Sequence, residues 1–340
     1  MVKERKSNIE LLRIIIMIGV ILLHFNHPSY GGALQYVNQG SLNYYFIHFV
    51  ESLFIGAVNI FVLISAFFLS KTQKRDGKKI LLLILQVILF KLGLYLIKCL
   101  VKKDVLSLYG LTYAVIPNNY FVILYGALYM ISPYINIMVD HIQKKQFEKL
   151  LFMMILLFSV WPTLGDVLSS IMNHPLNGIS SIGLQGSQSG YTIVNFVLLY
   201  LFGAYFQKNT YIQFSRMKLI FLIIMTTILI TLWSLKDSTN AWAYCNPLVV
   251  MQAVFVFILF LKIDIGSSRT INNLATATFT VYLLNVDLLV LCVDKTYINK
   301  NIFILMLYMF VISIIIYVIC WGVSKIYDKA IDIILKKIRL

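Results

Sequence analysis

The sequence predicts an all-α integral membrane protein with about ten transmembrane helices and with both termini in the cytoplasm. Two features of its composition and one of its charge distribution indicate this class. Hydrophobic residues make up 60% of the 340 residues and charged residues only 13%, whereas a soluble domain carries about 25% charged residues. Mean hydropathy is +0.84. We therefore expect a single membrane domain over residues 1–340 with short connections between its helices.

Ten segments are long and apolar enough to cross a bilayer, because a transmembrane helix needs about 20 predominantly apolar residues. The first follows a basic stretch at residues 3–6, as in a signal peptide. No small-residue cleavage site comes after it, so we interpret it as a retained helix. The predicted spans cover approximately residues 10–27, 46–70, 80–101, 119–139, 149–165, 190–207, 217–235, 243–262, 272–293 and 302–324.

The basic residues predict the orientation of these spans. Of the 29 Lys and Arg residues, 21 fall in segments that the ten-span model places in the cytoplasm and five in outer loops, while Arg13, Lys91 and Lys98 fall within spans. Cytoplasmic loops of membrane proteins carry an excess of Lys and Arg. We therefore interpret the net charge of +15 as topology, and we expect no nucleic-acid partner although a basic soluble protein would suggest one.

The cysteines and acidic residues do not predict a metal or redox site. Cys99, Cys245, Cys292 and Cys320 lie in or beside apolar segments without paired or metal-like spacing. We expect all four to be buried and unpaired. No cluster of His, Asp and Glu and no Gly-rich phosphate loop stands in the sequence, so we predict no metal and no permanently bound cofactor.

Two outer segments, residues 28–45 and 166–189, lack Lys and Arg and are rich in Gly, Ser, Asn and Gln. Hydroxyl-rich ligands need dense hydrogen-bonding groups, and the first segment adds aromatic residues that could stack on sugars. Ordinary solvated loops have the same composition. The sequence therefore leaves both interpretations open for each segment.

The first span concentrates ionisable residues, which cost several kcal/mol within a membrane unless they are paired or hydrated. Arg13 and His24 are eleven positions apart, close to three helical turns, so they share a face at a separation of about 16 Å. Glu10 and His27 extend this stripe by three positions at either end. The pattern favours a functional face.

Each of these side chains suits a step of group transfer. A cation at the cytoplasmic end, Arg13, could bind the phosphates of a cytosolic donor. The imidazole of His24 could accept a proton from an acceptor hydroxyl near neutral pH. The alternative is structural: Arg13 extends to lipid headgroups and His24 hydrogen-bonds inside the bundle. His48 and Glu51, at the outer start of the second span, are expected to stay hydrated.

Five segments, in order along the chain, resemble the membrane-bound acyltransferase 3 family, whose members O-acylate bacterial cell-surface polysaccharides. The first holds an Arg and a His separated by ten residues, similar to the family's hallmark pair in its first helix. The others are similar to motifs that follow through the rest of the family domain. The matching segments are Asn8–Ile14 with His24, Asn59–Leu69, Ser132–Asn136, Leu199–Tyr205 and Thr278–Leu284.

The resemblance implies a bacterial plasma-membrane enzyme that transfers an acetyl group from its co-substrate acetyl-CoA to a hydroxyl of a polysaccharide or glycolipid. His24 would be the catalytic histidine and Arg13 a donor-site residue. Glu10, His27 and Ser65 are further candidates for lining the site, although Ser65, deep in the second span, favours a bond to a backbone carbonyl or close packing over a role as nucleophile. Membrane lipids would surround the protein. Direct attack on the thioester and an acetyl-histidine intermediate both fit these residues.

Two positions depart from the family pattern. Ala66 stands where relatives commonly have Gly after a serine, and its methyl group would tighten a close helix contact. Asn285 stands where many relatives have His. Because Asn still forms hydrogen bonds, we interpret this change as tolerated variation.

Two further classes of function use the same residues. A transporter or flippase for a glycan or lipid would employ the buried charges as a substrate pathway, although the sequence has no visible inverted repeat. A noncatalytic partner of polysaccharide machinery would not depend on His24. Labelling of a glycan from acetyl-CoA would distinguish the enzyme from a transporter, and loss of that labelling on replacement of His24 would distinguish it from a noncatalytic partner.

Overall fold

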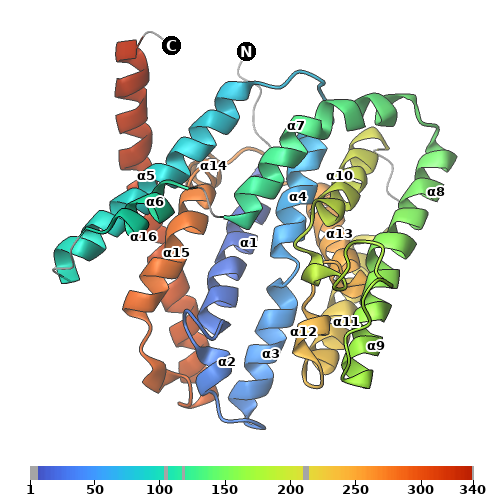
Figure 1. Ribbon diagram of the computed structural model, residues 1–340, viewed down its shortest axis with the longest axis horizontal. Coiled ribbons are helices and arrows are strands. Elements are labelled where there is room, and N and C mark those ends of the chain that lie inside the picture. The colour runs from blue at the N-terminus through green and yellow to red at the C-terminus, as the bar shows by residue number, and fades with distance from the viewer. Residues whose placement is uncertain (1–6, 103–105, 117–118, 210–213, 339–340) are drawn as a thin grey trace. The chain divides into compact units, whose positions relative to one another are not determined.

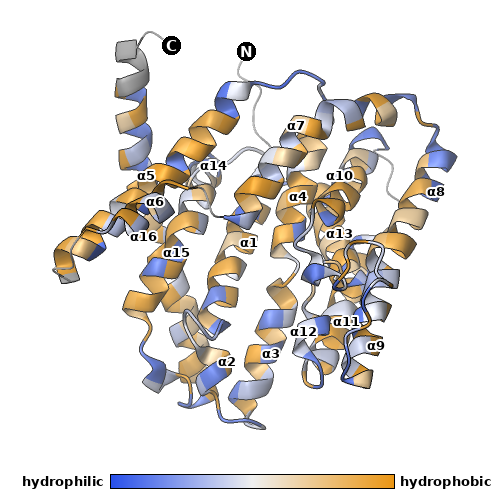
Figure 2. Cartoon of the chain, in the orientation of Figure 1, coloured by the Kyte–Doolittle hydropathy of each residue, from blue (hydrophilic) through white to orange (hydrophobic). Residues whose placement is uncertain are grey.

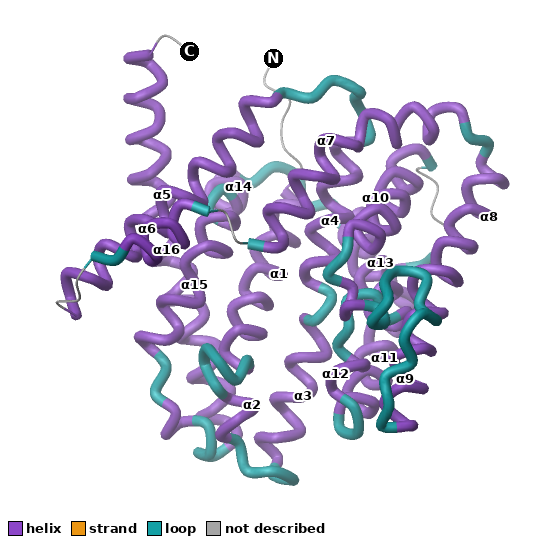
Figure 3. The backbone as a smooth tube through the Cα atoms, in the orientation of Figure 1, coloured by secondary structure: helices purple, strands orange, loops and turns teal. Residues whose placement is uncertain are grey.

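The computed structural model describes residues 7–102, 106–116, 119–209 and 214–338. Regular structure in these residues is helical (Figures 1 and 3), apart from one isolated β-bridge between Gly183 and Gly186. The basic stretch at residues 3–6 lies outside them. The chain divides into two compact units: unit 1 comprises Met1–Phe61 and Gln213–Leu340, and unit 2 comprises Val62–Ile212.

Unit 1 is built from both ends of the chain. Its first part contributes three helices and its second part the remainder. The helices are α1 (Ser7–Asn26), α2 (Ala33–Tyr36), α3 (Leu42–Phe54), α11 (Arg216–Ser234), α12 (Ser238–Ala241), α13 (Pro247–Lys262), α14 (Arg269–Ala275), α15 (Thr278–Cys292), the 3-10 turn η3 (Lys295–Tyr297) and α16 (Ile302–Ile338).

Unit 2 is a continuous segment of chain. Helix α4 (Ala57–Leu69) begins in unit 1 and continues into unit 2. The other elements of unit 2 are α5 (Gly77–Lys102), α6 (Leu108–Val115), α7 (Tyr120–His141), α8 (Lys144–Ile155), the π-helical turn η1 (Leu156–Val160), α9 (Trp161–Met172), the 3-10 turn η2 (Gln188–Gly190) and α10 (Ile193–Lys208).

The helices follow the predicted spans in order. Seven spans in the described residues are long and apolar enough to cross a membrane, and the count is eight if the pair α14 and α15, bent by 54°, is one span. Helices α10 and α13 occupy the two remaining predicted places with 16 residues each, fewer than predicted. Hydrophobic residues run along the helices, and hydrophilic ones gather at their ends (Figure 2). The prediction of an all-α polytopic membrane protein is confirmed.

Several helix boundaries follow from capping that hydropathy does not detect. The hydroxyl oxygens of Ser41, Thr192 and Ser215 accept hydrogen bonds from backbone N–H groups in the first turns of α3, α10 and α11. Such caps satisfy donors that would otherwise lack a partner at a helix start. Helix α16 reaches Ile338, well beyond the predicted end at residue 324, because its polar continuation outside the apolar stretch is also helical.

One prediction about the cysteines is wrong. Cys99, Cys245 and Cys320 are buried, but Cys292 is exposed. It is the last residue of α15, where the chain leaves the helix for the η3 turn. None of the four cysteines forms a disulfide in the described residues.

Helix α1 is the central element of unit 1 and packs against α3, α13, α14, α15 and α16. In Figure 1 it lies between α3 and α15. Its first turn is held by a bond from Ser7 N to Gly266 O at 3.1 Å and by one from Asn8 Nδ2 to Phe260 O at 2.8 Å. At Gly19 a side chain would clash with the Phe54 ring, 2.2 Å away. These contacts fix the ionisable stripe within the unit.

Candidate active site

The predicted stripe lies on one uninterrupted helix. Because α1 is continuous from Ser7 to Asn26, Arg13 and His24 keep their expected separation of about 16 Å along a shared face. Arg13 Nη1 lies 3.4 Å from Glu10 Oε2, and the Arg13 side chain is 30% exposed. The ion pair places Glu10 beside the guanidinium and leaves that group accessible. This end of the stripe is therefore cationic but locally compensated.

Asn285 of α15 contacts the catalytic candidate directly. Its Oδ1 lies 2.5 Å from His24 Nδ1. Its Nδ2 donates to the backbone carbonyls of Val281 and Tyr282, at 2.8 and 2.9 Å. Because carbonyl oxygens only accept hydrogen bonds, the amide nitrogen faces the two carbonyls and the amide oxygen faces the histidine.

This orientation determines the tautomer of His24. Since Oδ1 of Asn285 only accepts hydrogen bonds, Nδ1 of His24 carries a proton. In neutral imidazole the other nitrogen, Nε2, then has a lone pair and can accept a proton. Nε2 has no hydrogen-bond partner in the described residues, and His24 is only half-buried. The arrangement presents an oriented base at an accessible position.

A short aromatic cluster continues from His24 beyond the end of α1. The ring of Tyr30 meets the His24 ring edge-on at 5.4 Å and stacks on His27 at 4.5 Å. His27 is exposed, and its Nδ1 accepts a hydrogen bond from Ser29 N at 3.1 Å. Partial desolvation lowers the pKa of His27 below its ordinary value. His27 is therefore an exposed, hydrogen-bonding group at this end of the stripe.

The expectation that His48 and Glu51 stay hydrated is wrong. They are only 4% and 8% exposed. His48 Nδ1 lies 2.8 Å from Ser234 Oγ, and Glu51 Oε2 accepts from Asn26 Nδ2 at 2.8 Å. The sequence places these residues near the edge of a span, but packing of α3 against α1 and α11 buries them.

Ser65, the fifth predicted site residue, belongs to unit 2. It lies on α4, is half-buried, and its hydroxyl has no hydrogen-bond partner among the residues that the structure describes. The other four predicted residues all lie on or directly after α1 in unit 1. The described residues contain no group of three His, Cys, Asp or Glu side chains that could hold a metal ion.

Comparison with known families identifies the chain. A family model described as an acyltransferase domain, that of the acyltransferase 3 family, matches residues 6–325. The chain belongs to the acyltransferase 3 family. No curated protein and no solved structure matches the chain significantly. The protein is thus a multi-pass membrane acyltransferase.

In this acyltransferase, side chains of the segment Ser132–Asn136 form hydrogen bonds that compensate for a proline inside α7. Pro133 lies inside α7 and cannot donate the hydrogen bond that the carbonyl of Tyr129 would receive in a regular helix. The Ser132 hydroxyl donates to that carbonyl instead, at 2.7 Å. Asn136 Nδ2 donates to Leu69 O and Thr72 O, at 2.9 and 2.8 Å. This segment therefore stabilises helix structure in unit 2.

Gly203, in the segment Leu199–Tyr205 of the acyltransferase, lies against Ala66, the residue that departs from the family pattern. An ideal side-chain carbon at Gly203 would lie 2.5 Å from Ala66 Cβ and 2.7 Å from Leu63 O. Ala66 is fully buried. The predicted close contact thus exists, and the missing side chain at Gly203 makes room for the methyl group of Ala66.

Proposed function

We propose that the protein is an O-acetyltransferase that uses acetyl-CoA and acetylates a hydroxyl group of a cell-surface polysaccharide or its glycolipid precursor. The observation that carries this proposal is the oriented base: Asn285 fixes the proton of His24 on Nδ1 and leaves Nε2 bare. Family membership supplies the acyl transfer. The identities of the acyl donor and of the acceptor, and the role of His24, are our proposals.

The spacing of the stripe suits this donor. Acetyl-CoA carries its phosphates and its thioester at opposite ends of a long, flexible arm. Arg13 and His24 lie about 16 Å apart on one face of α1, so phosphates near the guanidinium place the thioester toward the imidazole. Charge-assisted hydrogen bonds from Arg to phosphate are strong and directional.

The chemistry requires one base that later acts as an acid. His24 Nε2 removes the proton of the acceptor hydroxyl while the hydroxyl oxygen attacks the thioester carbonyl. The carbon–sulfur bond breaks, the imidazolium at Nε2 returns its proton to the leaving thiolate, and the products are the acetyl ester and the free thiol of CoA. Asn285 holds the imidazole during both transfers and stabilises its protonated form by accepting from Nδ1. An acetyl-histidine intermediate would employ the same nitrogen.

The acceptor is proposed to reach His24 from the end of α1 that carries Tyr30 and His27. Aromatic and polar residues without Lys or Arg characterise residues 28–45, a composition that suits a neutral sugar. The predicted orientation places this end outside the cytoplasm of a bacterial cell. Acetylation of an exported glycan would follow from that location.

Inside-out membrane vesicles supplied with labelled acetyl-CoA test the proposal. An acetyltransferase transfers label to a glycan as a base-labile ester, and His24→Gln abolishes this transfer. His141→Gln is the matched control, because His141 is exposed on α7 and, among the described residues, bonds only to the carbonyl of Ile137. Movement of a glycan without labelling would identify a transporter, and equal labelling by both variants would identify a noncatalytic partner.

A further inference from the structure

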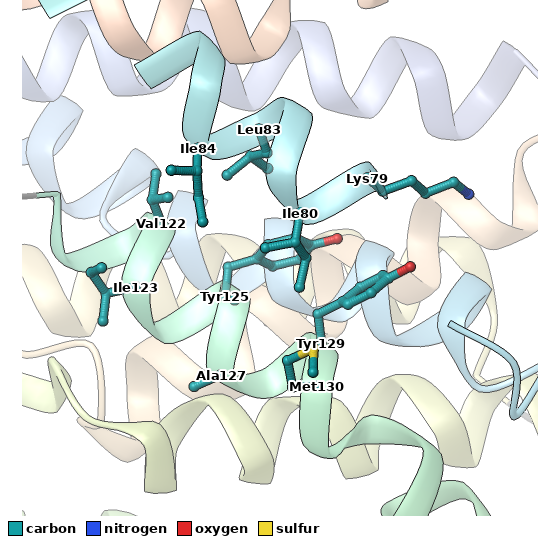
Figure 4. Close-up of a pocket in the computed structure, with 11 residues that line it drawn as sticks. Lys79, Ile80, Leu83, Ile84, Val122, Ile123, Tyr125, Ala127, Tyr129 and Met130 are labelled. Carbon is teal, nitrogen blue, oxygen red and sulfur yellow. The ribbon is translucent and has the colours of Figure 1, made fainter. Parts of the chain in front are cut away.

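Helices α5 and α7 of unit 2 enclose an apolar groove that takes no part in the proposed chemistry. Its volume is about 300 Å³, at the lower end of the range for small-molecule sites. Ile80, Leu83 and Ile84 of α5 and Val122, Ile123 and Met130 of α7 form its walls, as Figure 4 shows. The groove offers a long hydrocarbon ligand contacts on two sides.

A glycine leaves open space in the wall of the groove. A side-chain carbon added at Gly126 would meet no atom within 4 Å. Gly126 lines the groove, so the space that its missing side chain leaves is part of the binding volume. Gly93 on α5 also faces open space but does not line the groove, and it provides a matched control.

The polar groups of the groove lie together. In Figure 4 the ammonium of Lys79 and the hydroxyls of Tyr125 and Tyr129 extend toward one side, away from Val122 and Ile123. Tyr129 is fixed there, because its hydroxyl accepts from Asp76 N at 3.1 Å and donates to Asp76 O at 3.2 Å. One end of the groove is thus polar, and its walls are aliphatic.

Lys79 supplies an uncommitted positive charge at this polar end. Its side chain is exposed and its Nζ has no hydrogen-bond or ion-pair partner in the described residues. Arg75 differs, because its guanidinium donates to Leu69 O, Thr72 O and the Ser132 hydroxyl among others. The segment 71–79 carries five Lys and Arg residues and one acidic residue. Such juxtamembrane basic clusters attract anionic lipids.

We propose that this groove binds an anionic phospholipid, with one acyl chain between α5 and α7 and its phosphate at Lys79. The ligand must be amphipathic, because hydrogen-bonding groups stand only toward one side of the groove. It must be anionic, because Lys79 lies in the first turn of the membrane helix α5, close in sequence to the other cations of segment 71–79. A phospholipid of the leaflet that faces segment 71–79 meets both requirements. This site is independent of His24 and of the acyl-transfer proposal.

Native mass spectrometry of the purified full chain tests the site with two probes, phosphatidylglycerol and phosphatidylcholine with identical acyl chains. We expect wild type to bind phosphatidylglycerol about fivefold more tightly, the preference that one nearby lysine supplies. Lys79→Gln should remove most of this preference, while Lys78→Gln, on a neighbouring side chain outside the groove, should retain it. Gly126→Leu should lose the tightly bound lipid, and Gly93→Leu should keep it.

Three outcomes would overturn the proposal. Equal lipid retention by Gly126→Leu and Gly93→Leu would show that the groove holds no lipid. Equal affinity of wild type for both phospholipids would remove the role of Lys79. Displacement of phosphatidylglycerol by an equimolar long-chain acyl-CoA would assign the groove to a donor. Circular dichroism of each variant, compared with wild type, separates loss of binding from loss of folding.

Discussion

Two groups of polar side chains, one at the end of α1 in unit 1 and one around Asn136 in unit 2, have different partners. In unit 1 they pair with other side chains between helices: His24 with Asn285, and Asn26 with Glu51. In unit 2 Asn136 donates to backbone carbonyls at the end of α4 and receives a bond from the Tyr200 hydroxyl at 2.6 Å. Both arrangements satisfy buried groups. The two arrangements differ in whether a polar atom remains without a hydrogen-bond partner.

The group at the end of α1 leaves polar atoms without a partner in the described part of the chain, whereas the group around Asn136 engages them. His24 keeps Nε2, and the Oδ1 of buried Asn26 has no hydrogen-bond partner in the described residues. In unit 2, by contrast, both amide groups of Asn136 are engaged. A buried polar atom without a partner costs free energy. The free Nε2 of His24 supports the proposal that unit 1 carries the chemistry, and the full set of bonds at Asn136 supports a structural role for that residue in unit 2.

The largest expected effect comes from His24→Gln. Glutamine keeps hydrogen-bonding capacity at a similar size but cannot accept a proton near neutral pH. General-base catalysis contributes about a hundredfold to ten-thousandfold, so initial rates of acetyl transfer in vesicles should fall by that factor. Protein level and thermal stability should match wild type. Near-normal acetylation by this variant would show that His24 of unit 1 is not the base.

Arg13→Ala should raise KM for acetyl-CoA by about tenfold to a hundredfold, because a hydrogen bond to a charged group contributes about 1.5 to 3 kcal/mol. Arg13→Lys should retain part of the affinity, since a lysine is a point charge without the two-pronged geometry of arginine. Steady-state kinetics at varied acetyl-CoA measure both. Unchanged KM in the two variants would exclude Arg13 from the donor site.

Hydropathy and charge predicted the fold because membrane insertion depends on those same quantities. Ten apolar segments and their basic flanks appear directly in the sequence, and the helices follow them. The exact helix ends were not predicted, because they depend on caps such as Ser41 and, in α16, on a polar continuation that is also helical. The short α10 and α13 are apolar cores of segments whose flanks are not helical.

The site was predictable only where its residues share one helix. Helical periodicity aligned Glu10, Arg13 and His24 without any knowledge of other elements. The contact of His24 with Asn285 joins positions 261 residues apart, and no local pattern encodes such a contact. The burial of Glu51 was not predicted for the same reason, since its hydrogen-bond partner, Asn26, comes from a different helix. An amide at a position where relatives have His was the available signal for Asn285.

Asn285→Leu should lower kcat about threefold to tenfold, the contribution of one neutral hydrogen bond, with KM for acetyl-CoA unchanged. Asn285→Asp should retain the bond to Nδ1, and the acid limb of its pH–rate profile should move to higher pH, because a carboxylate stabilises protonated imidazole. A residue with a merely structural role would not move this limb. Identical pH–rate profiles for Asn285→Asp and wild type would show that Asn285 does not position the base.

Asn136→Leu tests whether the polar contacts of Asn136 in unit 2 stabilise the structure. The substitution removes bonds to Leu69 O and Thr72 O and leaves the buried Tyr200 hydroxyl without its acceptor. Each unsatisfied buried group costs about 1 to 3 kcal/mol, so the thermal midpoint in detergent should fall clearly. The rate of acetyl transfer per folded molecule should stay near wild type. A selective fall in that rate at unchanged stability would contradict the division between the units.

The smallest expected effect on transfer comes from the contact of Ala66 with Gly203. Gly203→Ala inserts a methyl group 2.5 Å from Ala66 Cβ and 2.7 Å from Leu63 O, and overpacking of this kind costs about 1 to 3 kcal/mol. Adding Ala66→Gly should restore part of the loss in thermal midpoint, because it removes one of the two clashes and leaves the carbonyl of Leu63 in place. Ala66→Gly alone should restore the family's usual residue, open a small gap and cost less than Gly203→Ala. If the two substitutions were additive in their effect on the thermal midpoint, the methyl group of Ala66 would not be what Gly203 accommodates.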